Sequence, residues 1–295
     1  MRVTDRIKFD AFKNNLALIK SNLDKTQNKI ASGKKILVPS DDPVSSSVAV
    51  GFNAEKGLNA QYGRNIERLK TTGVFYETSI NSVNNMLTRA KEIAIVQASD
   101  TVNAETRKSA GEEVKGIIER LVAIGNTKVG NHYIFGGKKS NNTPFSIDSD
   151  YNVTFNGSNE VSSIFVDKGT KEDAGISGDK VFISDTNIFN VLKNFKDALE
   201  TNNKTGIRNA LDGLDKSLEK TQTNLVHVGT YTARIENFIE YNESKNNNII
   251  ETLSQIMDVD VAQAVVDFNS LSNAYEAMIY TMTKIQNLSV LNYLR

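Results

Sequence analysis

The residue types that most often perform chemistry in proteins are scarce in this sequence. Its 295 residues include no cysteine and only two histidines, His132 and His227, which lie far apart in the chain. A disulfide framework, a thiolate zinc site and a cysteine nucleophile are therefore excluded, and two lone histidines do not form the histidine-rich set of a metal centre. We expect no metal, no cofactor and no catalytic residue.

Three further motifs have both a chemical and a structural interpretation. Asp41-Asp42 would suit a metal, but Pro43 follows directly, and this order favours a helix N-cap. Lys34-Lys35 would suit nucleic acid or a membrane surface, but a solvated face or an acidic partner segment is favoured. Gly136-Gly137 lacks the Lys-Ser/Thr pair of a phosphate loop, so it indicates a turn with close backbone approach. No nucleophile–base pair stands out, so the sequence does not favour an enzyme.

Charge and hydropathy exclude other classes of protein. Lys+Arg and Asp+Glu are both 35, so the chain as a whole is not a basic nucleic-acid binder. No apolar run is long enough to span a membrane, and the mixed-charge N-terminus does not resemble a cleavable secretory signal. Residues 1–40 carry nine basic and three acidic side chains, whereas residues 256–295 carry two and four. We expect this difference to help the two ends pair.

The elements that the sequence predicts are mostly long helices. Apolar residues recur at steps of three and four over 8–31, from Pro43 to about 97, from about 103 to 130, from 185 to 199 and over 207–256. The last of these has polar seam residues at Thr232, Asn242 and Asn246, and polar seam positions usually fix register. Only three prolines occur, which suits a chain that must keep proline out of helix interiors.

Each end of the chain carries one heptad-like apolar stripe. The N-terminal assembly seam is Phe9, Phe12, Leu16, Ile19, Leu23 and Ile30, with Thr26 at the missing position. The C-terminal assembly seam is Phe268, Leu271, Tyr275, Met278, Met282, Ile285, Leu288, Leu291 and Leu294. We expect the two stripes to pair as a terminal coiled coil. The free energy of ordering two lone helices is close to zero, so neighbouring subunits should stabilise them. The stripes alone set no register.

Between the helical blocks, residues 133–184 lose the helical period. Frequent turn signals separate short runs that resemble strands, at 151–155, 164–166 and 180–183. The predicted fold is therefore mainly α: a long antiparallel helical bundle with terminal coiled-coil helices and a small inserted β-rich domain. The predicted domains are 1–40 with 256–295, 41–132 with 185–255, and 133–184.

Several motifs resemble those of bacterial flagellins and their relatives. At the N-terminal side these are Ile30-Ala31-Ser32-Gly33, Ile36 and Pro39-Ser40-Asp41-Asp42-Pro43. At the C-terminal side they are Asp258-Val259-Asp260-Val261-Ala262, Tyr275-Glu276-Ala277 and Leu288-Ser289-Val290-Leu291-Asn292-Tyr293-Leu294. The segment from Gly130 to Gly137, followed by Thr143-Pro144-Phe145, is more similar to the hook–filament junction members of that family than to filament flagellin.

The resemblance implies a structural role in the bacterial flagellum. The expected function is an adaptor that joins hook to filament and self-assembles through its paired terminal helices; the alternative is a short filament flagellin. The implied partners are further copies of the chain in a ring, the hook-side junction protein (hook-associated protein 1), filament flagellin, and an export chaperone on the C-terminal helix. The implied location is extracellular, after export through the flagellar type III apparatus, with no nucleic-acid or membrane partner.

Overall fold

The computed structural model describes residues 3–291, and the side chains of residues 3–6, 8 and 285–291 are outside the described set. The chain forms two compact units. One consists of the chain's two ends, up to Leu58 and from Lys245, and the other is Asn59–Ser244. The fold is mainly α, as the sequence predicts, with long helices and three small two-stranded sheets.

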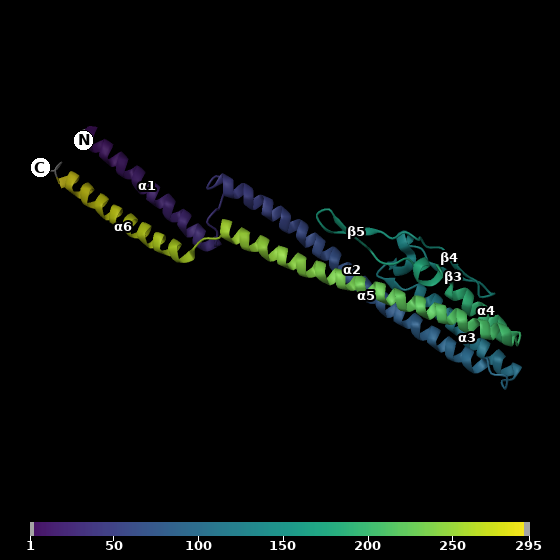
Figure 1. Cartoon of the computed structure of the whole chain (residues 1–295). Coiled ribbons are helices and arrows are strands. Elements are labelled where there is room, and N and C mark those ends of the chain that lie inside the picture. The colour runs from purple at the N-terminus through teal and green to yellow at the C-terminus, as the bar shows by residue number, and fades with distance from the viewer. Residues whose placement is uncertain (1–2, 292–295) are drawn as a thin grey trace. The chain divides into compact units, whose positions relative to one another are not determined.

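In the first unit, α1 (Val3–Ser32) lies beside α6 (Val261–Leu291), as Figure 1 shows. α1 ends where Gly33 adopts a φ of 69°, a left-handed conformation that glycine tolerates at a helix C-terminus. The same unit contains the first residues of α2 (Pro43–Gln97) and the last residues of α5 (Lys204–Met257).

In the second unit, the rest of α2 and α5 packs with α3 (Ala104–Gly125) and α4 (Ile188–Glu200). Contacts between Lys91 and Asp215 and between Asn59 and Asn242 show that α2 and α5 run antiparallel. Asparagine caps start the two shorter helices: Asn103 accepts from Thr106 N, and Asn187 accepts from Asn190 N. The core is one stripe from each helix, including Leu87, Leu121, Leu192 and Leu214, all fully buried.

The inserted region is a series of hairpins and short helical turns. Three antiparallel pairs form: β1 (Lys128–Val129) with β2 (His132–Tyr133), β3 (Phe145–Ile147) with β4 (Val153–Phe155), and β5 (Ser163–Asp167) with β6 (Thr170–Asp173). A 3₁₀ segment, η1 (Ile134–Lys139), and a π-helical turn, η2 (Asp179–Ile183), complete it. Gly137 has a φ of 60°, and a Cβ there would lie 2.1 Å from the Ser158 carbonyl oxygen, so this turn requires glycine.

Two sequence expectations about local structure are wrong. The run 180–183 was expected as a strand, but it lies in η2. Val181 and Phe182 are consecutive and both buried, and Phe182 packs against Phe135, Phe145 and Phe189, so tertiary packing overrides β propensity. The third helix ends at Gly125 rather than near 130, because β1 begins at Lys128.

Candidate assembly surfaces

The N-terminal seam residues face one side of α1. Phe12, Leu16, Ile19, Leu23 and Ile30 are half-buried, as is Thr26, whereas most residues between them are exposed. Phe9, at the start of the stripe, is 40% exposed. This pattern is the one that a helix gives when a single neighbour covers one face.

The C-terminal seam residues show the same pattern on α6. Phe268, Leu271, Tyr275, Met278 and Met282 are half-buried. Ile285, Leu288 and Leu291 lie within α6, but their side chains are outside the described set, and Leu294 lies outside the described residues. The structure therefore brings the described parts of the two stripes to the facing sides of α1 and α6.

The terminal pair buries its seam less completely than the second unit does. None of the described seam residues of α1 or α6 is fully buried, whereas Ile80, Leu87 and Leu214 of the four-helix core are completely inaccessible. Two helices cannot enclose a side chain that lies between them, because no third element covers the flanks of the seam. Apolar surface on this pair is therefore left for a further neighbour to cover.

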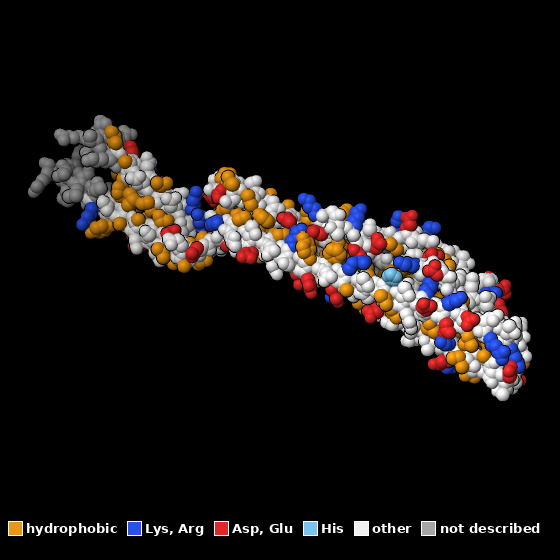
Figure 2. Space-filling model, viewed as in Figure 1, with side chains coloured by type: hydrophobic (Ala, Val, Ile, Leu, Met, Phe, Trp, Pro, Cys, Tyr) orange, Lys and Arg blue, Asp and Glu red, His pale blue; other side chains and the backbone are white. Residues whose placement is uncertain are grey.

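Large apolar side chains also point away from the seam. On α6, Val265 and Val266 are 41% and 61% exposed, and Ile279 and Tyr280, fourteen residues later, are 39% and 62% exposed. Fourteen residues are close to four helical turns, so the two pairs lie on similar faces. Figure 2 shows hydrophobic side chains along the described part of this helix pair. Sequence analysis missed them, although the fourteen-residue repeat was a usable signal. Others in the same unit include Ile7, Leu18, Val44, Val48, Val50, Leu58 and Val261.

The two carboxylates in the segment between α1 and α2 accept hydrogen bonds from backbone amides. Asp41 Oδ2 accepts from the amides of Leu37 and Val38, and these bonds hold the pKa of Asp41 below its usual value. Asp42 Oδ1 accepts from Ser45 N at 3.0 Å at the start of α2, and hydrogen bonds from Ser45 lower the pKa of Asp42. The helix-cap interpretation is therefore confirmed for Asp42 and wrong for Asp41, whose carboxylate instead holds the turn that precedes α2.

The β5–β6 hairpin docks on α2 and α5. Val166 of β5 is buried with Ile66 and Leu69 of α2 and with Tyr231 and Ile235 of α5. Polar contacts at the edge of this cluster join Asn65 Nδ2 to the Phe165 carbonyl oxygen at 2.8 Å, and Arg234 to Glu172 at 2.6 Å. The turn at Lys168-Gly169 is exposed. The β5–β6 hairpin is therefore anchored on one side and exposed at its tip.

Neither histidine belongs to a reactive cluster. His132 and His227 are both exposed, and His132 Nδ1 lies 3.1 Å from Ser140 Oγ. Among the described residues, no group of three or more His, Cys, Asp or Glu side chains is placed to hold a metal. No described helix is long and apolar enough to cross a membrane.

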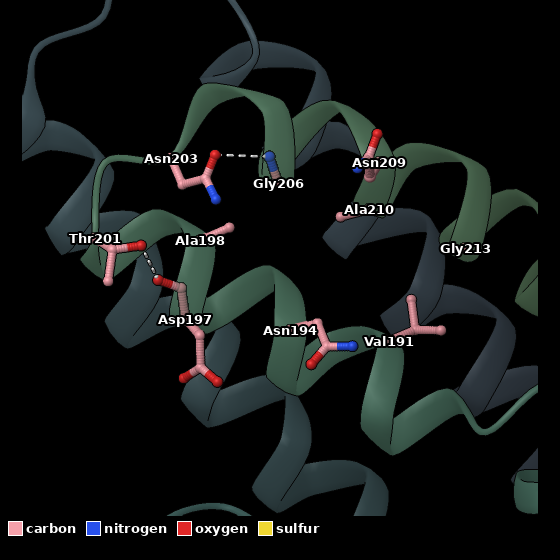
Figure 3. A pocket seen from close by; sticks show the side chains of 10 residues that line it. All are labelled: Val191, Asn194, Asp197, Ala198, Thr201, Asn203, Gly206, Asn209, Ala210 and Gly213. Carbon is pink, nitrogen blue, oxygen red and sulfur yellow. Dashed lines mark hydrogen bonds between the residues drawn. The ribbon is translucent and has the colours of Figure 1, made fainter.

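A depression of about 410 Å³ lies between α4 and α5 (Figure 3). Small residues and amides line it, including Ala198, Asn203, Gly206 and Asn209. Asn203 Oδ1 accepts from Gly206 N, and Thr201 Oγ1 donates to the Asp197 carbonyl oxygen, so these groups serve the α4–α5 turn. Asp197 also lines the depression, and its carboxylate pairs with Lys193 and Lys196.

Comparison with known proteins is consistent with this geometry. Two family models match: the bacterial flagellin N-terminal helical region over residues 7–140, and the bacterial flagellin C-terminal helical region over residues 211–294. Together they span most of the chain. The chain belongs to the bacterial flagellin family. It is therefore a structural component of the bacterial flagellum and not an enzyme.

Individual relatives include flagellar hook-associated protein 3 of Escherichia coli, 26% identical over 89% of this chain and 90% of the relative. The protein of the same name from Salmonella typhimurium is 24% identical over 98% of both chains. A putative flagellar hook-associated protein from Vibrio parahaemolyticus superposes with a TM-score of 0.68, at 20% identity over 74% of this chain and all of the other, which supports the fold. Flagellins also match at about 24% identity.

Proposed function

We propose that this flagellin-family chain is the subunit that joins the flagellar hook to the filament. The observation that carries the proposal is the α1/α6 pair, which brings the two chain ends together with a half-buried seam and with apolar side chains on its outer faces. Such a pair can be covered further by copies of itself. The hook-associated relatives that match along almost the whole chain support the junction role.

The proposed partners follow from that role. Further copies of the chain form a ring, hook-associated protein 1 lies on the hook side, and filament flagellin lies on the other. An export chaperone on the C-terminal helix and delivery through the type III apparatus complete the proposal, and they place the working protein outside the cell. We also propose that residues 1–40 with 256–295, 41–132 with 185–255, and 133–184 act as its three domains.

The alternative is a short filament flagellin, which the matching flagellins keep open. The two roles differ in what the purified chain does on a prepared end. A filament flagellin elongates without limit from seeds, whereas a junction subunit adds a layer of fixed height to hooks that carry the hook-side protein. Electron micrographs of hooks after incubation with the chain distinguish these outcomes.

The seam is tested by placing a charge in it. Leu16→Asp or Met282→Asp puts an unpaired carboxylate into the half-buried α1/α6 contact, which an apolar seam cannot solvate or pair. In cells that lack the native gene, we expect the variants to be exported but not incorporated, giving hooks without filaments and flagellin lost to the medium. Val226→Asp, at a side chain that is 69% exposed on α5, is the matched control and should assemble. Normal motility of either seam variant would contradict the proposal.

A further inference from the structure

The terminal seam does not by itself fix the register of α1 against α6. Its described members are apolar at every position except Thr26, and they recur with a seven-residue repeat on both helices. A slip of one heptad, about 10 Å at 1.5 Å per residue, would again place apolar side chains opposite apolar side chains. Something outside the seam must select one register.

The two short segments that connect the helices are paired with one another. Lys35 N donates to the Met257 carbonyl oxygen at 2.7 Å, and Val259 N donates to the Gly33 carbonyl oxygen at 3.0 Å. These two backbone bonds bracket the isolated antiparallel bridge between Lys34 and Asp258. Only Gly33 separates this bridge from the end of α1, and only two residues separate it from the start of α6.

Side chains select which residues meet at this bridge. Lys34 Nζ lies 2.5 Å from Asp258 Oδ1, and the other oxygen of Asp258 accepts from Ser254 Oγ at 2.6 Å. Lys35 Nζ donates to the Gln255 carbonyl oxygen at the end of α5. Among the described residues, Lys34–Asp258 is the ion pair that joins residues 1–40 to residues 256–295. In the described part of the chain, the opposite charges of the two ends thus meet at this bridge.

We propose that the Lys34–Asp258 bridge is the register determinant of the terminal helix pair, with Lys34 and Asp258 as its positioning residues. Because α1 and α6 run antiparallel away from the bridge, residues at equal distances from Lys34 and Asp258 lie at the same level. Leu16 is eighteen residues before Lys34, and Glu276 is eighteen residues after Asp258. This register therefore places Leu16 beside the seam residues that flank Glu276, which are Tyr275 and Met278. A slip of one heptad would instead set Lys34 at the level of Val265 or Glu251, where neither backbone bond nor the Asp258 carboxylate is available. The short connections make this bridge the first contact from which the two helices can zip together.

The absence of cysteine allows a direct test of register. Leu16→Cys with Tyr275→Cys reports the native register by oxidative cross-linking within the full chain. Leu16→Cys with Met282→Cys reports a slip of one heptad toward Val265, and Leu16→Cys with Phe268→Cys reports a slip toward Glu251. We expect the native pair to cross-link in strong preference in the otherwise unchanged chain. Asp258→Lys, which replaces the attraction to Lys34 with repulsion, should lower that preference roughly fivefold or more. The exchange of both residues, Lys34→Asp with Asp258→Lys, should restore it.

Two further variants separate this role from a general effect of charge or folding. Asp267→Lys makes the same change of charge on the exposed surface of α6, away from the bridge, and should leave the preference unchanged. Val259→Pro removes the N–H that bonds to Gly33, and the charge exchange should not rescue it. The proposal is overturned if Asp258→Lys and Val259→Pro keep the native preference, if the exchange fails to restore it, or if the unchanged chain shows no preference. The readout needs no flagellum, so it can fail or succeed independently of the junction role.

Discussion

Two buried tyrosines give a matched pair of substitutions at the scale of single residues. The hydroxyl of Tyr76 donates to the Ile134 carbonyl oxygen at 2.5 Å, whereas the hydroxyl of Tyr231 is buried without a hydrogen-bond partner. Burial raises the pKa of Tyr76 to about 12 and raises that of Tyr231 as well. Tyr76→Phe should reduce the free energy of unfolding by about 1–2 kcal/mol, and Tyr231→Phe should leave it unchanged or raise it. Urea denaturation of both variants checks this, and equal losses would contradict it.

Lys220 should make the stability of the fold depend on pH, and its burial determines the direction of that dependence. Its Nζ donates to the Ser184 and Thr186 carbonyl oxygens, and burial lowers its pKa from 10.5 to about 8, against the smaller opposing effects of Asp185 and Asp179. Between pH 8 and 10.5 the unfolded chain therefore holds a proton that the folded chain has released. Stability from this group must rise with pH across that window.

Comparison with Lys220→Met isolates this contribution. The difference in free energy of unfolding, unchanged protein minus variant, should increase between pH 8 and 10.5, because the variant lacks the titrating group. Both are measured by denaturant unfolding at several pH values, so that the other lysines and tyrosines cancel in the difference. A difference that stays flat or falls with pH would contradict the assignment.

At the scale of elements, the α2/α5 seam contains one reciprocal amide pair. Asn59 Nδ2 donates to the Asn242 carbonyl oxygen at 3.0 Å, and Asn242 Nδ2 donates to the carbonyl oxygen and Oδ1 of Asn59. Asn59→Leu or Asn242→Leu alone removes the side-chain bond between Asn242 Nδ2 and Asn59 Oδ1 together with one bond to a backbone carbonyl oxygen, and should cost about 1–3 kcal/mol. The double variant removes both amides and should recover most of that loss. A double-mutant cycle by urea denaturation measures the coupling, and additive losses would contradict the pairing.

The helices could be predicted from the sequence because their evidence is local. The caps at Asp42-Pro43 and Asn103 and the stop at Gly33 are each formed by residues within a few positions of the helix end. The run 180–183 could not be predicted, because its form is decided by Phe135, Phe145 and Phe189, which are distant in the chain or in other elements. The pairing of Lys34 with Asp258 could not be predicted either, because 224 positions separate the two residues and the apolar stripes of the two helices do not specify their register.

At the scale of the whole molecule, the surfaces that would contact other copies and the exposed hairpin turns lie in different units. Both described chain ends lie in one unit, together with exposed apolar side chains on α1, α2 and α6. The inserted hairpins lie entirely within the other unit, and there the aromatic cluster and the α2/α5 contacts anchor them. A change at the tip of a hairpin therefore need not disturb the residues that would meet another copy, whereas a change within α1 shifts half of the seam against α6.

This separation predicts opposite outcomes for one tag placed at two positions. A short epitope inserted between Lys168 and Gly169 enters the exposed turn of the β5–β6 hairpin, where Gly169 already adopts a φ of 81° and no Cβ contact is present within 4 Å. We expect this protein to restore filaments in cells that lack the native gene, and the tag to bind antibody on intact flagella. The same epitope after Thr26 displaces Phe12, Leu16, Ile19 and Leu23 from their register with α6 and should abolish assembly without preventing export. Immunogold micrographs and immunoblots of the medium distinguish these outcomes. If antibody does not bind the Lys168 tag on intact flagella, or if cells with the tag at Thr26 are motile, then the chain ends are not the part of the molecule that contacts other copies.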